Sequence, residues 1–153
     1  MNDLFNTPFE TGLRAMLILY STETTGMTID RIASYDFFTI YGSDLGISEK
    51  NLHGINHFNF SELSSKRAIC SEGVKSFILE GLISITRSKN GFLYVLIPTG
   101  KQYVESLKST YKTQYMGILK MVHKKYVLFQ QKILLLDVLV ADSMLEKEKC
   151  AVQ

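Results

Sequence analysis

The chain has 153 residues, of which 46% are hydrophobic and 21% charged, values that are ordinary for one packed domain. This composition excludes a disordered chain, a collagen-like repeat and a low-complexity linker. The net charge is only +2, but residues 1–60 carry seven acids and three bases, whereas residues 101–153 carry five acids and nine bases. This polarity suits a protein that touches different partners with its two ends, although ordinary solvated faces produce the same drift.

Nothing in the sequence predicts a membrane span or a secretory signal. The most apolar stretch, residues 127–141, is interrupted by charged and amide side chains and is shorter than the roughly 20 residues of a spanning helix. The first ten residues lack a basic region followed by an apolar core. Cys70 and Cys150 are far apart and have no CxxC spacing, which is typical of free thiols in a reducing compartment. We therefore expect a cytoplasmic protein.

Two helices are predicted in the first 42 residues. Thr7 can cap a helix whose first turn contains Pro8, and apolar side chains continue through Tyr20. Thr28 can cap a second helix, which Gly42 ends. The apolar residues of both segments recur at helical spacing, so each helix should bury much of its surface.

A third helix and a β-hairpin follow a long loop. Residues 61–80 place apolar side chains on one helical face, and Gly81 is positioned to stop that helix. Residues 82–86 alternate apolar and polar, an Asn-Gly pair stands at 90–91, and residues 92–97 return as a second strand. This combination predicts a hairpin with a tight turn.

A long apolar stripe begins after Pro98. Its members are spaced three or four apart and no proline interrupts them, which predicts either one long helix or two helices with a bend. The stripe can form a seam against another chain, or its second half can fold back on the first three helices. Its members are Val104, Leu107, Tyr111, Tyr115, Ile118, Val122, Tyr126, Phe129, Ile133, Leu136 and Val140.

The order of elements predicts a mainly α fold with a small β-hairpin. Three helices, a hairpin and a further helix are typical of a winged-helix domain, which we place at residues 1–100 with its wing at about 82–97. A long C-terminal helix or helix pair follows at 101–146 in the same unit, and residues 147–153 form a tail. Function does not follow from this fold, because winged helices bind DNA and also proteins.

Candidate chemistry is sparse. His53 and His57 are four apart, but they lie in a glycine- and asparagine-rich loop without a third ligand at a supporting spacing, and His123 stands alone. No phosphate-binding loop, nucleophile elbow or zinc-protease motif occurs. We therefore expect no catalytic residue, no cofactor, no metal site and no small-molecule substrate.

Four basic side chains are candidate DNA contacts. Lys66 and Arg67 belong to the third helix, in the recognition position, and Arg87 and Lys89 belong to the wing. The third helix has as many acids as bases, and specific DNA-binding proteins usually make more phosphate contacts than these residues allow. Independent sequence-specific binding is therefore the less favoured interpretation.

Several segments are similar to a known family. Residues 6–14 (NTPFETGLR) resemble the opening of the middle components of bacterial ABC-ATPase three-component conflict systems, of which the Lamassu anti-phage systems are the best-known kind. Residues 35–44 and 61–67, with Gly73 and residues 81–83, resemble the family's following segments up to the wing. The resemblance covers about residues 4–100, and the long helix is similar in kind only. At residues 66–67 the chain has Lys-Arg where two adjacent arginines are expected.

The resemblance implies a non-enzymatic adapter. Such a protein bridges an SMC- or Rad50-like ABC ATPase and an effector, often a nuclease, and keeps the effector quiet until foreign DNA is sensed, with any DNA contact made through the complex. We expect the long helix to carry the partner-binding surface, and Tyr115→Asp to break the complex while the domain still folds. The predicted partner-binding residues are Tyr111, Tyr115, Ile118, Val122, Tyr126, Phe129, Lys120, Lys124 and Lys125.

Two other functions stay open from the sequence. In a winged-helix transcriptional regulator, the four basic residues would contact phosphate and the long helix would be a homodimer seam. An antitoxin-like inhibitor would have one toxic partner.

Overall fold

The computed structural model describes residues 7–23, 25–43, 46–49, 52, 61–89 and 91–151, apart from the side chains at 61–64, 133, 134 and 137. The chain divides into two compact units, Met1–Val122 and His123–Gln153. The first unit contains a helical core with a hairpin, and the second is helical from His123 to Ala151.

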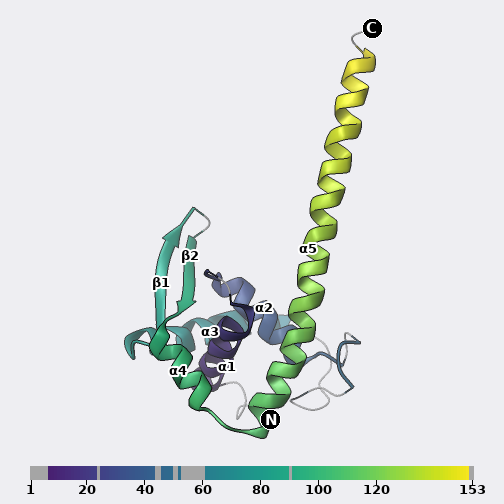
Figure 1. The fold of residues 1–153 in the computed structure, drawn as a ribbon. Coiled ribbons are helices and arrows are strands. Elements are labelled where there is room, and N and C mark those ends of the chain that lie inside the picture. The colour runs from purple at the N-terminus through teal and green to yellow at the C-terminus, as the bar shows by residue number, and fades with distance from the viewer. Residues whose placement is uncertain are drawn as a thin grey trace. The chain divides into compact units, whose positions relative to one another are not determined.

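The elements follow in the predicted order (Figure 1). The confirmed fold class is mainly α, with a two-stranded antiparallel hairpin and a C-terminal helix. The winged-helix assignment and the domain limits remain predictions. The elements are α1 (Pro8–Thr22), α2 (Ile29–Ile40), α3 (Ser61–Leu79), β1 (Ile83–Ser88), β2 (Gly91–Leu96), α4 (Pro98–Ser106) and α5 (Thr110–Ala151).

Threonine caps fix the starts of α1 and α2, as the sequence predicts. The side-chain oxygen of Thr7 accepts a hydrogen bond from the backbone N–H of Glu10, and Thr28 accepts one from Arg31. Each cap satisfies a backbone donor that the first turn of a helix leaves without a partner. The starts of these helices are therefore determined by local sequence.

The end of α3 and the hairpin also follow from local sequence. Gly81 adopts a φ of 75°, and the backbone N–H of Leu82 donates to the carbonyl of Phe77, which is the geometry of a glycine-terminated helix. β1 and β2 then pair from Ile83 opposite Leu96 to Ser88 opposite Gly91. Asn90, which the sequence assigns to the hairpin signal, lies outside the described residues.

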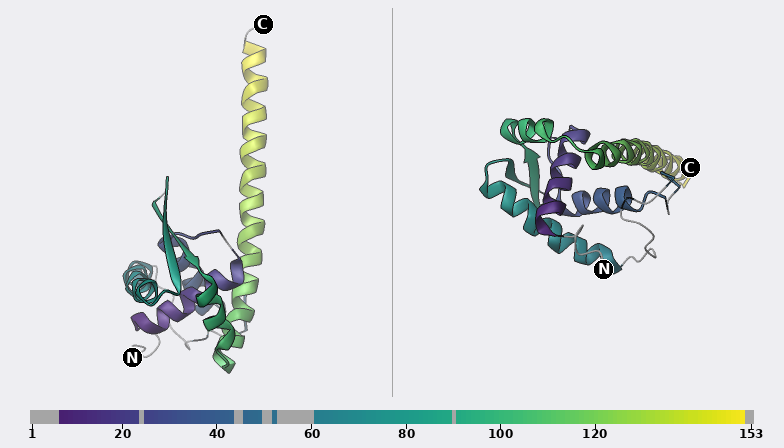
Figure 2. Two further views of the ribbon diagram at one scale, coloured as in Figure 1. Left: turned by 60° about the vertical axis from the view of Figure 1, so that its left-hand side comes forward. Right: turned by 90° about the horizontal axis from the view of Figure 1, so that it is seen from below.

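Two glycines let α1 and α3 cross with their backbones in contact. A Cβ on Gly73 would lie 2.1 Å from the carbonyl oxygen of Pro8 and 2.7 Å from the backbone nitrogen of Gly12. No larger residue fits at this crossing without separating the helices. α1 also packs on α2, so the three helices share one core (Figure 2). Fully buried members of that core include Met16, Ile18, Ile32, Phe37 and Val74.

The long apolar stripe is divided between two helices. α4 ends at Ser106 and α5 begins at Thr110, which selects the predicted alternative of two helices. The side chain of Ser109 accepts from the backbone N–H of Lys112 and so caps α5. The ammonium group of Lys112 then donates to the carbonyl oxygens of Val104 (2.5 Å) and Leu107 (2.8 Å), which satisfies carbonyls at the end of α4.

None of the helices in the described part of the chain is long and apolar enough to cross a membrane.

Candidate functional site

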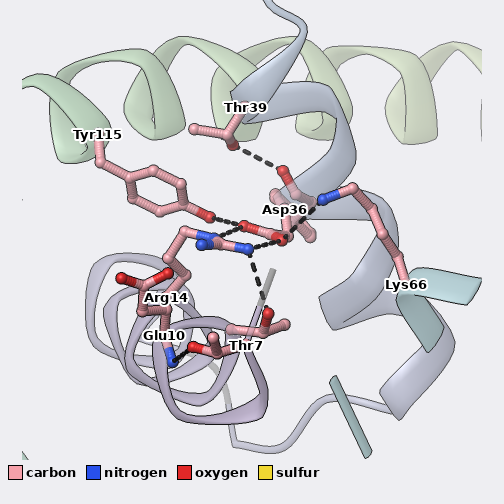
Figure 3. A network of polar contacts seen from close by, with 9 residues as sticks. Thr7, Glu10, Arg14, Asp36, Thr39, Lys66 and Tyr115 are labelled. Atoms are coloured by element: carbon pink, nitrogen blue, oxygen red, sulfur yellow. Dashed lines mark hydrogen bonds and ion pairs between the residues drawn. The ribbon is translucent and has the colours of Figure 1, made fainter. Parts of the chain in front are cut away.

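A buried carboxylate connects four helices of the first unit. Asp36 on α2 accepts hydrogen bonds at Oδ1 from Nε of Arg14 on α1 (2.7 Å) and from the hydroxyl of Tyr115 on α5 (2.6 Å). Nη2 of Arg14 donates to the second oxygen, Oδ2, at 3.1 Å, and Nζ of Lys66 on α3 lies 3.6 Å from the same oxygen. Figure 3 shows the three side chains converging on Asp36.

The environment of Asp36 keeps it ionised. Burial alone would raise its pKa, but the charges of Arg14 and Lys66 and the hydrogen bonds from Arg14 and Tyr115 outweigh that effect and hold the pKa at about 2. Burial also acts on the Tyr115 hydroxyl, and together with the neighbouring carboxylate it raises the pKa of Tyr115 well above its ordinary value. The network is therefore a carboxylate held by two cations and a neutral phenol at neutral pH.

This arrangement is suited to fixing helices rather than to chemistry on a substrate. The side chains of Arg14 and Asp36 are each only 3% exposed, and Tyr115 is fully buried. A bidentate pair between arginine and carboxylate is geometrically specific, so it favours one mutual placement of α1 and α2. Tyr115 adds the first turns of α5 to that placement.

The sequence carries a signal for this network in the positions of Asp36 and Arg14 on their helices. Asp36 is four residues from both Ile32 and Ile40 on α2, so it lies on the apolar face of the helix. Arg14 is four residues before the buried Ile18 on α1. A charge of opposite sign on the buried face of each of two consecutive helices indicates an internal ion pair.

The predicted partner-binding residues of the first unit separate into buried and accessible groups. Tyr115 is 0% exposed and Val122 is also buried, so in this conformation neither presents a surface. Because Tyr115→Asp would place a second carboxylate beside the buried Asp36, we expect this substitution to destabilise the first unit as well as to affect assembly. Tyr111 and Ile118 are half-buried, and Lys120 is exposed.

Tyr111 lines a mostly apolar hollow of about 340 Å³ on the first unit. Leu13 and Leu17 of α1 and Leu107 of the α4–α5 connection form its other apolar walls, and Glu10 lies beside them. A hollow of this size and lining fits one or two apolar side chains.

The predicted residues of the second unit are more accessible. Lys124, Lys125 and Phe129 are exposed, and Tyr126 is half-buried. Phe129 is 60% exposed and belongs to a larger set of exposed apolar side chains on this helix. The set consists of Val127, Leu128, Phe129, Leu135, Leu136, Val138, Leu139, Val140, Met144 and Leu145.

The candidate DNA contacts differ in accessibility. Lys66 is buried beside Asp36, and the guanidinium of Arg67 pairs with the carboxylate of Asp30 on α2. Arg87 and Lys89 are exposed on the hairpin. Lys66 is therefore corrected from a DNA contact to a member of the internal network, because its charge balances Asp36.

The described residues include no group of three histidine, cysteine, aspartate or glutamate side chains that could hold a metal ion. His53 and His57, the histidine pair considered in the sequence, lie outside the described residues. Cys70 and Cys150 are free thiols, and burial raises the pKa of Cys70 to about 12.

These features define a small, mainly helical protein with a buried ion-pair network and exposed apolar side chains on its C-terminal helix. The chain belongs to the ABC-three component (ABC-3C) system Middle Component 2 family, whose family model matches residues 4–143. No curated protein and no solved structure gives a significant match. The family membership confirms the resemblance found in the sequence and extends it through most of α5.

Proposed function

We propose that this chain is a non-enzymatic adapter in a Lamassu-type defence complex, where it bridges an SMC- or Rad50-like ABC ATPase and an effector nuclease. A middle component of a three-component ABC system has an ATPase and an effector as its natural partners, and an adapter role is consistent with that membership. The observation that carries the proposal is the exposed apolar surface of residues 127–145. Apolar surface of this extent usually marks a protein–protein contact.

Two surfaces have a composition that fits binding to proteins: the exposed face of the C-terminal helix and the hollow lined by Tyr111. Tyr126 and Phe129 are aromatic, and aromatic residues are enriched at interface cores. Lys124 and Lys125 are exposed beside them and can pair with acidic groups of a partner or with DNA. On the first unit, the hollow lined by Tyr111 can receive an apolar side chain of a partner, because three leucines also line it.

Restraint of the effector is the second part of the proposal. An adapter that holds the effector in an inactive arrangement stabilises that arrangement by its differential affinity for it. Sensing of foreign DNA by the ATPase then shifts the complex toward the released state. The bidentate pair of Arg14 and Asp36 supports this role, because it favours one mutual placement of α1 and α2.

The adapter role is tested by co-expressing the tagged full chain with the ABC ATPase and the effector of the same system. Phe129→Asp introduces a charge into the exposed apolar face and should reduce recovery of at least one partner by about tenfold or more. The matched control is Phe92→Asp on β2, because Phe92 is also a large exposed aromatic residue, with 56% of its surface accessible against 60% for Phe129. Equal recovery with both variants would overturn the assignment of this face.

Restraint is tested in cells that express the effector and the ATPase without foreign DNA. Loss of the middle component, or its Phe129→Asp form, should release the nuclease and damage the host chromosome. Wild-type and Phe92→Asp chains should keep the cells viable. Unchanged viability in all four strains would leave the adapter without a restraining role.

DNA contact through the hairpin is a secondary proposal. Arg87 and Lys89 are exposed, whereas Lys66 and Arg67 are engaged with acidic side chains of α2. We therefore expect the assembled complex, and not the isolated chain, to bind DNA in a salt-dependent way. Fluorescence anisotropy with the Arg87→Ala/Lys89→Ala variant checks this, and tight promoter-specific binding by the isolated chain would support a transcriptional regulator instead.

A further inference from the structure

The second unit carries a heptad stripe as well as exposed apolar side chains. Tyr126, Phe129, Ile133, Leu136 and Val140 are spaced three, four, three and four along the helix. Such spacing keeps one seam facing a neighbouring helix. Phe129 and Leu136 are each 60% exposed and Val140 is 56% exposed, so the described members of the seam beyond Tyr126 are accessible.

Charge is segregated along the same helix. Residues 123–136 contain Lys124, Lys125 and Lys132 and no acidic residue, whereas residues 137–151 contain four acids and two lysines. Two copies placed side by side in the same direction would bring the two basic halves together. Two copies placed in opposite directions would bring each basic half against an acidic half, which is favourable and opposes the parallel pairing.

One register satisfies both the stripe and the charges. When Phe129 of one helix faces Val140 of an antiparallel copy, the positions that flank the seam bring Lys125 of each copy next to Glu146 of the other. Flanking charges of this kind determine the orientation and the partner of paired helices. Lys125 and Glu146 are both exposed and therefore available for these contacts.

We propose that in the free chain the helix of residues 123–151 pairs antiparallel with the same helix of a second copy, through the Tyr126–Val140 stripe. The pairing covers the apolar face of this helix when no other protein is bound. This inference goes beyond the adapter function and does not depend on it, because it concerns the chain in the absence of other proteins.

The first test measures the mass of the purified full chain by analytical ultracentrifugation. Wild type should sediment with twice the mass of the 17.4 kDa chain. Lys125→Glu and Glu146→Lys should each weaken the dimer about tenfold or more, because each turns two attractions into two repulsions. The Lys125→Glu/Glu146→Lys double variant should restore the wild-type dissociation constant. A wild-type monomer, or a double variant no stronger than the single ones, would overturn the proposal.

The second test determines the direction of the helices by disulfide formation. In a Cys150→Ser chain carrying Lys125→Cys and Glu146→Cys, mild oxidation should give a covalent dimer. The two new thiols are 21 residues apart on one helix, or about 31 Å, so they cannot react within one copy. Peptide mapping should show position 125 joined to position 146.

The wild-type chain provides the control for the direction of the helices. The two Cys150 thiols of a dimer would be adjacent only if the helices were parallel, so the wild-type chain should not cross-link efficiently. Efficient cross-linking through Cys150 would contradict the antiparallel register.

The outcome is separable from that of the adapter proposal. A chain that is monomeric alone but is recovered with the ATPase and effector would refute self-pairing and leave the adapter function standing. A chain that dimerises alone but recovers neither partner would support self-pairing and refute the adapter function.

Discussion

The hydroxyl of Tyr115 on α5 donates a 2.6 Å hydrogen bond to the carboxylate of Asp36 on α2, across 79 positions of sequence. Arg14 bonds the same carboxylate from α1. The apolar spacing predicts Tyr115 as part of a partner-binding surface, but in the structure its side chain belongs to the core of the first unit. Its hydrogen bond to Asp36 is a contact within the protein.

Removing the Tyr115 hydroxyl should destabilise the first unit without unfolding it. Tyr115→Phe keeps the ring but leaves Asp36 without one of its donors, which should lower the free energy of unfolding by about 1–3 kcal/mol. Urea denaturation followed by circular dichroism measures the change. Tyr103→Phe on α4, outside the network, is the control, and an equal effect of both variants would show that the hydroxyl of Tyr115 contributes nothing particular.

The low pKa of Asp36 should make stability fall at acidic pH. The folded-state pKa is about 2 and the ordinary value is 3.8, so the unfolded chain takes up the proton first as the pH falls. The contribution of Asp36 to the free energy of unfolding is full above about pH 5 and is lost progressively between there and about pH 1, for a total of about 2–3 kcal/mol. Denaturation at a series of pH values measures it. In Asp36→Asn, the free energy of unfolding should fall by about 2–3 kcal/mol less over this pH range than in wild type. An equal fall in both proteins would show that Asp36 does not have a lowered pKa in the folded chain.

The crossing of α1 and α3 should not tolerate a methyl group. Gly73→Ala would place its Cβ against the backbone of Pro8 and Gly12 and should cost about 1–3 kcal/mol of unfolding free energy. Gly117→Ala on α5 is the matched control, because nothing lies within 4 Å of the added Cβ. Alanine favours the helix there and should stabilise it by up to about 1 kcal/mol. Thermal unfolding of both variants gives the comparison, and two effects of the same sign would be inconsistent with the close crossing.

The two cysteines should differ sharply in reactivity. Cys150 is exposed, whereas burial raises the pKa of Cys70 to about 12, so Cys70 has almost no thiolate at neutral pH. Iodoacetamide should label Cys150 within minutes and Cys70 only after denaturation, as intact-mass and peptide analysis would show. Rapid labelling of Cys70 in the folded chain would mean that the core opens near α3.

The sequence predicts the elements of this fold where short-range chemistry controls them. Thr7, Thr28 and Gly81 mark helix ends because capping depends on neighbouring residues alone, and the hairpin follows from its alternating strands and its turn. The sequence does not locate the gap between α4 and α5, because no proline or glycine lies in residues 107–109. Ser109 is the signal there, as a serine whose side chain caps the new helix.

The candidate site is less predictable because it depends on contacts between distant residues. The spacing of the apolar stripe is the same whether the chain's own core or another protein covers it, so it could not distinguish Tyr115 from Phe129. The cationic side chain of Lys66 likewise has the same sequence signature on a DNA-facing helix and beside a buried carboxylate. Only the packing of α3 against α2 decides between the two.

Asp36 obtains its partners from α1, α3 and α5, so the chain must reach residue 115 before its set of partners is complete. During synthesis, α1, α2 and α3 leave the ribosome first, and until Tyr115 follows them they carry this carboxylate without its phenol donor. The first unit should therefore complete its folding late, while the chain is still held by residues of its C-terminal helix.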